Sequence, residues 1–360
     1  MRVRGINYDT GFSPAGRNSR QLFEPTSVGR EMRIIADELH CDAVRITGGD
    51  PDRLSVAAEH AGAVGLEVWF APFPCEMSTD ELLPYFADCA ERAEIVRRRG
   101  IEVVFVMGCE LSMFAIGFFP GHTVLDRIEA LSSGSAEVLT CLTQLKTKLD
   151  DFLDDALAVV RDRFGGKVTY AAGPWEHIDW TGFDVVAVDA YRSSQNAASY
   201  RDEIRAHFEH DKPVAVTEFG TCAYQGAAAR GGMAWAILDQ TSEVPRLTEE
   251  PVRDEGEQVR YLNEVLAILD EEGVDCAFWF TFAAFGLPHT ADPADDLDLA
   301  SYGIVKMQDH ESWEPKEGFH VMANAFAVKS HVLVATSSVA DGAAVPDMSR
   351  DVDPVDHRHD

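Results

Sequence analysis

The sequence has few basic residues. It contains 31 Lys and Arg residues against 61 Asp and Glu residues, for a formal net charge of −30. Such a surface repels phosphate groups, so we expect no nucleic-acid partner and no anionic membrane surface as a partner. Two explanations of the acidic surface stay open, namely solubility and adaptation to high salt.

Several common motifs are missing as well. The seven cysteines include no C-x-x-C pair, which argues against a zinc site and against a disulfide framework. The segment Met-Arg-Val-Arg-Gly-Ile-Asn-Tyr at residues 1–8 has no signal-peptide core, and no apolar run is long enough to span a membrane. We therefore expect a cytoplasmic protein.

Nucleotide-binding signatures are also lacking. No Gly-x-Gly-x-x-Gly follows the first apolar run, and no P-loop is present. These absences disfavour a doubly wound nucleotide-binding sheet, and we expect no cofactor.

What the sequence does contain is a regular alternation of short apolar runs and amphipathic stretches. Eight runs read as buried strands, at residues 3–7, 43–47, 67–72, 103–107, 168–172, 185–189, 214–217 and 276–281. Eight strands alternating with helices over about 300 residues predict a (β/α)8 TIM barrel, a fold of the α/β class. We assign residues 1–330 to this single domain and predict that the polar, Asp-rich residues 331–360 form a disordered tail.

Three connections are longer than a minimal strand-to-helix loop. They cover residues 114–149, 222–253 and 283–301, and we expect elaborated loops at the face where the carboxyl ends of the strands meet. The third carries several aspartates between Asp292 and Asp298. Calcium binding is one interpretation, but a solvated loop is favoured because the spacing does not match an EF-hand.

Two glutamates stand at strand ends. Glu110 follows the run Val-Val-Phe-Val-Met-Gly-Cys, and Glu218 follows Val-Ala-Val-Thr. In a (β/α)8 barrel the working residues lie at the carboxyl ends of the strands. Two carboxyl groups in such positions suggest acid–base work on a glycosidic bond.

The same face should carry further polar and aromatic side chains. Aromatic rings stack on sugar rings, and polar groups bond sugar hydroxyls, so we expect a carbohydrate substrate there. A barrel that binds a metal would want His-x-His after the first strand, where this chain has Asn-Tyr-Asp, so we expect no metal. The predicted substrate-binding residues are Tyr8, Asp9, Arg45, Trp69, Trp175, Tyr191 and Trp279.

These positions resemble the clan A glycoside hydrolases. The resemblance covers roughly residues 1–330 and rests on strand-end residues and on the segments 301–305 and 313–316 near the end of the barrel. The chain also resembles an uncharacterised group often labelled abortive infection protein. The strand-end residues that carry the resemblance are Arg45, Glu110, Tyr191, Glu218 and Trp279.

The resemblance implies roles. Glu218 would be the nucleophile and Glu110 the general acid/base, while Arg45 and Tyr191 would bind the Glu218 carboxylate and Trp279 would floor the sugar site. One departure matters. Many clan members carry Asn immediately before the acid/base residue, and this chain has Cys109, a poor hydrogen-bonding partner for a sugar hydroxyl.

The predicted function is therefore a retaining glycoside hydrolase that acts on a small glycoside or oligosaccharide. Two alternatives stay open. One is a non-catalytic sugar-binding or regulatory barrel, for example in phage defence. The other is a metal-dependent barrel hydrolase. The sequence does not indicate the oligomeric state.

Overall fold

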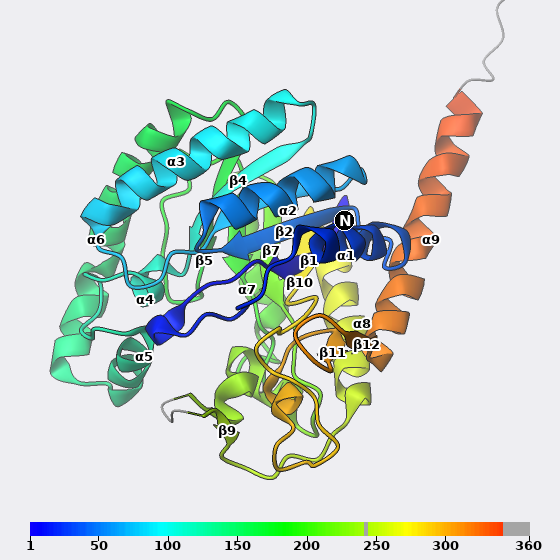
Figure 1. The fold of residues 1–360 in the computed structure, drawn as a ribbon. Helices are drawn as coiled ribbons and strands as arrows, with labels where there is room; N and C mark the ends of the chain where they lie inside the picture. Colours follow the sequence, from blue (N-terminus) through cyan, green and yellow to red (C-terminus); the bar gives the residue numbers. More distant parts are fainter. Residues whose placement is uncertain (241–243, 341–360) are drawn as a thin grey trace, which may run out of the picture.

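A closed barrel of eight parallel strands forms the centre of the molecule (Figure 1). The computed structural model describes residues 1–240 and 244–340. The barrel strands are β1 (Val3–Asp9), β2 (Ala43–Gly48), β3 (Glu67–Pro72), β4 (Val103–Cys109), β5 (Lys167–Ala172), β6 (Val186–Asp189), β7 (Val214–Phe219) and β10 (Cys276–Trp279). Each matches one of the eight predicted runs, so the predicted (β/α)8 fold is confirmed.

Helices cover the outside of the barrel because each strand is apolar on both faces. They are α1 (Pro25–Asp37), α2 (Pro51–Ala63), α3 (Thr79–Arg98), α6 (Ala136–Arg161), α7 (Tyr200–Ala206), α8 (Glu255–Glu271) and α9 (Glu317–Ala340). Among the described residues, no helix is both long enough and apolar enough to cross a membrane.

The barrel interior is filled by side chains. Trp69 and Phe278 pack there with ring centroids 4.8 Å apart. Gly5 leaves room for this pair, because a Cβ atom at residue 5 would lie 2.5 Å from the Phe278 ring. This part of the barrel is therefore a packed core, and only the end where the carboxyl ends of the strands meet is free to hold a site.

The extra segments gather at one end of the barrel, at the lower side of Figure 1. They are η1 (Pro14–Gly16), α4 (Leu111–Phe114), α5 (Val124–Ser133), η3 (Ala227–Ile237), η4 (Leu297–Ala300), the pair β8 (Leu238–Asp239) and β9 (Arg246–Leu247), and the pair β11 (Val305–Met307) and β12 (Trp313–Pro315). The segments α5, η3, β8, β9 and η4 lie in the three connections that were predicted to be elaborated. The segment η1, nearly all of α4, and the pair β11 and β12 lie outside those predicted ranges.

One connection departs from a regular barrel. Residues 173–185 join β5 to β6 without a helix. The ammonium group of Lys212 fastens this loop, because it donates to the carbonyl oxygens of Trp180, Thr181 and Phe183. Trp180 and Phe183 pack edge to face at 5.6 Å between ring centroids and fill the space that a helix would cover.

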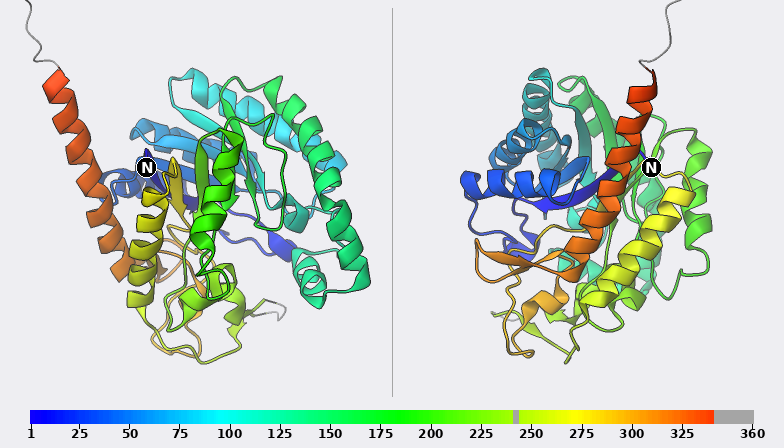
Figure 2. Two further views of the ribbon diagram at one scale, coloured as in Figure 1. Left: turned by 180° about the vertical axis from the view of Figure 1, so that it is seen from behind. Right: turned by 90° about the vertical axis from the view of Figure 1, so that its right-hand side faces the viewer.

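The predicted disordered tail needs a correction at its start. Helix α9 continues through residue 331, where the tail was expected to begin, and ends at Ala340. Figure 2 shows that α9 runs beside α8 and then leaves the side of the barrel. The rest of the predicted tail, residues 341–360, lies outside the described residues.

Candidate active site

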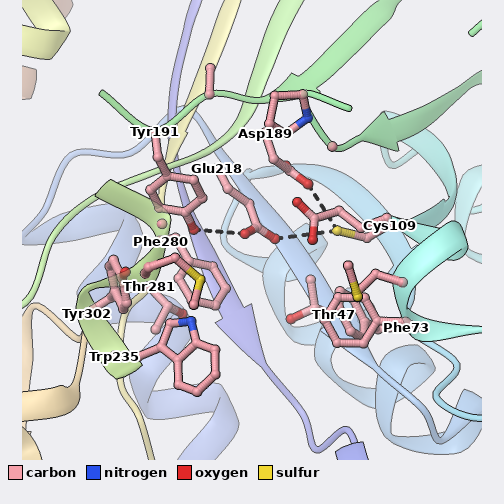
Figure 3. Close-up of a pocket in the computed structure, with 18 of the residues that line it drawn as sticks. Thr47, Phe73, Cys109, Asp189, Tyr191, Glu218, Trp235, Phe280, Thr281 and Tyr302 are labelled. Atoms are coloured by element: carbon pink, nitrogen blue, oxygen red, sulfur yellow. Dashed lines mark hydrogen bonds between the residues drawn. The ribbon is translucent and has the colours of Figure 1, made fainter. Parts of the chain in front are cut away.

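A cavity of about 1750 Å³ opens at the carboxyl ends of the barrel strands. Its walls come from loops far apart in the sequence (Figure 3). Four acidic side chains at strand ends line it, namely Asp9 of β1, Glu110 after β4, Asp189 of β6 and Glu218 of β7.

The Glu218 carboxylate is held by two side chains. The Arg45 Nη1 atom donates to Oε1 at 2.7 Å, and the Tyr191 hydroxyl donates to Oε2 at 2.9 Å. Arg45 is fully buried and also donates to Asn7 Oδ1 at 2.8 Å. An ion pair fixed in this way orients one carboxylate toward the cavity and leaves it little freedom to rotate.

Glu110 occupies the sharp turn after β4. Its backbone has φ 44° and ψ 45°, the left-handed region that a side chain rarely adopts. The side chain is half-buried and lines the cavity, and its carboxyl group has no hydrogen-bond partner among the described residues. Burial, followed by the negative charges of Asp189 and Glu218, raises the pKa of Glu110 well above its usual range. These surroundings favour the protonated form of Glu110 more than water does.

Asp189 is a third carboxyl group that the sequence interpretation did not include among the site residues. It is the register partner of Glu218 on the neighbouring strand, and only 2% of its surface is exposed. Burial and then the charge of Glu218 raise the pKa of Asp189 to about 8. A signal for it was present, because Asp189 ends the apolar run Val-Val-Ala-Val as Glu110 and Glu218 end theirs.

Cys109 lies between the acidic groups. Its Sγ atom is 3.1 Å from Asp189 Oδ2 and 3.7 Å from Glu218 Oε1, as Figure 3 shows. Burial, together with Asp189 and Glu218, raises the pKa of Cys109 well above its ordinary value. Cys109 is therefore a thiol that fills the space beside the two carboxyl groups.

Two clusters in the described part of the chain combine ligand types that metals use. In the first, atoms of Cys109, Asp189 and Glu218 lie within 4.8 Å of one another. It fits a metal poorly, because the thiol keeps its proton and the Arg45 guanidinium already binds Glu218 at 2.7 Å.

The second cluster joins His289, Asp296 and Asp298. Arg253 lies 2.6 Å from Asp296 and 2.9 Å from Asp298, and Lys316 lies 2.9 Å from Asp298. These cations already neutralise the two aspartates. The two aspartates of the acidic loop therefore take part in a structural ion cluster.

Three predicted substrate contacts need correction. Trp279 is 1% exposed and points outward, where it packs on Phe219 and Tyr261 and donates to Tyr302 O. Tyr8 also faces the helix layer, where its hydroxyl group donates a hydrogen bond to Glu31 and accepts one from Arg20. Trp69 lies deep in the barrel and donates to Glu67. None of the three lines the cavity.

The other predicted residues lie in or against the cavity. Asp9, Trp175 and Tyr191 line it, and Arg45 lies behind Glu218. Burial raises the pKa of Asp9, whose carboxyl group accepts a hydrogen bond from the Gly11 amide at 2.7 Å.

Further aromatic side chains surround the acidic groups. Figure 3 shows Trp235, Phe280 and Tyr302 on one side of Glu218 and Phe73 on the other. Phe114 packs edge to face on Phe73 at 4.7 Å. The predicted substrate-binding residues did not include these five, although Phe73 directly follows the third predicted strand. The sequence offers one indication of Phe280, because it follows Trp279 and neighbouring residues on a strand face opposite sides. It offers none for residues within the long connections, such as Trp235.

Comparisons with known proteins find similarity in fold only. No protein-family model and no curated protein matches the sequence. Among solved structures, a GH113 beta-1,4-mannanase matches with a TM-score of 0.61 and 15% identity, over 91% of this chain and 99% of that one. A GH113 beta-mannanase from Alicyclobacillus acidocaldarius in complex with ManMIm gives 0.59 and 18%, over 91% and 97%.

The match extends to a larger enzyme. A β-glucuronidase from Ruminococcus gnavus gives a TM-score of 0.51 and 12% identity, over 91% of this chain and 49% of that one. The chain has the barrel fold of these glycoside hydrolases. At such low identity the likeness concerns the fold, so the chemistry must be argued from the site itself.

Proposed function

We propose that this protein is a retaining glycoside hydrolase with Glu218 as nucleophile and Glu110 as general acid/base. The observation that carries the proposal is the contrast between two glutamates that line one cavity. Glu218 is ion-paired and fixed, whereas Glu110 has a raised pKa and no hydrogen-bond partner among the described residues. Two carboxyl groups in different protonation states are what a double displacement requires.

The reaction would take place in two steps. An oxygen of Glu218 attacks the anomeric carbon, the bond to the leaving group breaks, and the proton of Glu110 passes to the leaving oxygen. A water molecule then attacks the same carbon and gives a proton to the Glu110 carboxylate, while the ester bond to Glu218 breaks. Retention requires a separation of roughly 5–5.5 Å between the two carboxyl groups. The negative charge of Glu218 is one of the causes that raise the pKa of Glu110, in keeping with two carboxyl groups that lie near each other.

The substrate would be a small glycoside or an oligosaccharide. Aromatic side chains flank the acidic centre on two sides, so sugar rings could stack there. Because mannanases are among the proteins of similar fold, β-mannosides are the first substrates to test.

The decisive experiment is a panel of aryl glycosides with the wild type, Glu218→Ala and Glu110→Ala. We expect turnover by the wild type that survives a chelator, loss in Glu218→Ala, and rescue of that variant by azide. Glu129→Ala, a change at an exposed carboxylate on α5, is the control and should behave like the wild type. Sensitivity to the chelator would favour a metal-dependent hydrolase. Binding of sugars without any turnover would favour a sugar-binding barrel.

A further inference from the structure

The turn that carries Glu110 is braced by a second acidic residue. Glu110 has a left-handed backbone, and the short helix α4 starts directly after it. The amide groups of Leu111 and Ser112 begin this helix and so have no partner within it. They need acceptors from elsewhere if the turn is to keep its shape.

Those acceptors come from β5 and from the loop that follows it. Glu176 Oε1 accepts from the Ser112 amide at 3.0 Å, and the Tyr170 hydroxyl oxygen accepts from the Leu111 amide at 2.7 Å. Tyr170 in turn donates to Glu176 Oε2 at 2.8 Å. Both amides after Glu110 are thus tied to one buried carboxyl group.

Glu176 is itself fixed in place. Only 6% of its surface is exposed, and the Gly173 amide donates to Oε2 at 2.9 Å. The neighbouring Trp175 reinforces the link, because its indole nitrogen donates to Ser112 Oγ at 2.9 Å. Glu176 accepts hydrogen bonds from the Ser112 amide, the Tyr170 hydroxyl and the Gly173 amide, and no ion pair joins it to a cation in the described part of the chain. These partners point to a positioning task.

We propose that Glu176 is a positioning residue for the general acid, and that it acts with Tyr170 by fixing the turn that directs the Glu110 carboxyl group into the cavity. The proposal rests on the proposed function. Glu176 would affect proton delivery by Glu110 but not the attack by Glu218. The effect of changing Glu176 on the first step should therefore depend on whether the leaving group needs a proton.

The test uses two substrates with the same sugar. A dinitrophenol leaving group departs without a proton, whereas phenol needs one from the acid. In Glu176→Gln and in Tyr170→Phe, we expect kcat/KM for the phenyl glycoside to fall by about 10- to 100-fold, within the range that general acid catalysis supplies. The kcat/KM of the dinitrophenyl glycoside should stay within about threefold of the wild type, because kcat/KM reports the first step, which needs no acid for this leaving group. It does not report the second step, in which Glu110 acts as base for both substrates.

The matched control is Glu94→Gln. Glu94 has the same exposed fraction of 6% but lies on α3, where it is paired with Arg97 and Arg98. Glu94→Gln should change kcat/KM for the two substrates by the same factor. If Glu176→Gln does not fold, as judged by circular dichroism, Tyr170→Phe carries the test alone.

The outcomes separate clearly. The positioning role would be overturned if kcat/KM fell equally for both substrates in Glu176→Gln and Tyr170→Phe, or fell for neither. The hydrolase proposal would stay intact in both cases. A wild type that turns over neither substrate in the panel would overturn the proposed function, and the role of Glu176 with it.

Discussion

The Sγ atom of Cys109 lies 3.1 Å from Oδ2 of Asp189, and both groups are almost completely buried. Asp189 is thus a carboxyl group with a thiol on one side and the Glu218 carboxylate on the neighbouring strand. An acid in such a place resists ionisation, because a second negative charge beside Glu218 is unfavourable. The site therefore combines a fixed carboxylate with neighbouring acids whose pKa values are raised.

Asp189→Asn should make stability less dependent on pH. The pKa of Asp189 is raised to about 8 in the folded protein, from an ordinary value of 3.8. Between these values the folded state holds a proton that the unfolded state has lost, so stability falls as pH rises through this window. Between pH 5 and pH 8, the free energy of unfolding of the wild type should fall by roughly 1–3 kcal/mol more than that of the variant. Denaturant unfolding at several pH values measures this, and parallel curves for the two proteins would contradict it.

Arg45→Met should destabilise the fold strongly. Arg45 is fully buried, and its loss leaves the Glu218 carboxylate without its charged partner, at a cost of roughly 3–5 kcal/mol. The double variant Arg45→Met, Glu218→Gln should recover more than half of that loss, since no unpaired charge remains.

The control for that pair is Arg205→Met. Arg205 contacts Glu272 at 2.6 Å on the surface, where its removal should change the melting temperature little. Failure of the double variant to recover any stability would show that Arg45 acts through packing and not through its charge.

Tyr191→Phe should weaken catalysis without unfolding the protein. The hydroxyl group donates to Glu218 Oε2 at 2.9 Å, and a hydrogen bond to a charged group is worth roughly 1.5–3 kcal/mol. We expect kcat/KM for aryl glycosides to fall by about 10- to 100-fold. Tyr85→Phe, which removes a hydroxyl bonded to backbone oxygens beside α3, is the control. Equal kinetics for Tyr191→Phe and the wild type would remove Tyr191 from the site.

Cys109 should resist alkylation in the folded protein. Only the thiolate reacts readily, and burial among acidic groups raises the pKa of Cys109 well above its ordinary value. Brief treatment with iodoacetamide should label the half-exposed Cys141 first and leave activity unchanged. Mass spectrometry of the peptides reports the order. Labelling of Cys109 before Cys141 would contradict its assignment as a buried thiol.

The strands and the two catalytic candidates could be predicted from the sequence for one reason. Strands buried on both faces leave uninterrupted apolar runs, so an acidic residue that ends such a run is conspicuous. Glu110 and Glu218 were found in this way, and Asp189 gives the same signal.

The aromatic residues could not be placed so well. Tyr8 and Asp9 are neighbours on β1, yet Asp9 lines the cavity while Tyr8 faces the helices, because successive side chains on a strand alternate. Trp279 pairs in register with Ile6, which also faces outward. Which residue of a short run points inward is set by the closure of the barrel, and apolar runs do not reveal it.

Loop residues were harder still. Trp235 and Tyr302 lie 67 positions apart in the chain and reach the same wall of the cavity only because long connections fold back over the barrel. Their approach depends on long-range packing, such as the hydrogen bond from the Tyr302 hydroxyl to Gly231 O at 2.8 Å. No local pattern in the sequence predicts that these two residues lie on the same wall.

The short link between β5 and β6 has a consequence for how this barrel can change. In a regular unit, the outer helix supports the wall while the inner loop is free to diversify. Here one stretch of thirteen residues does both, since Lys212 anchors its far end and Trp175 and Glu176 hold the turn after β4. Exchanging this link for one from another barrel would therefore disturb the barrel wall and the turn that carries Glu110 together.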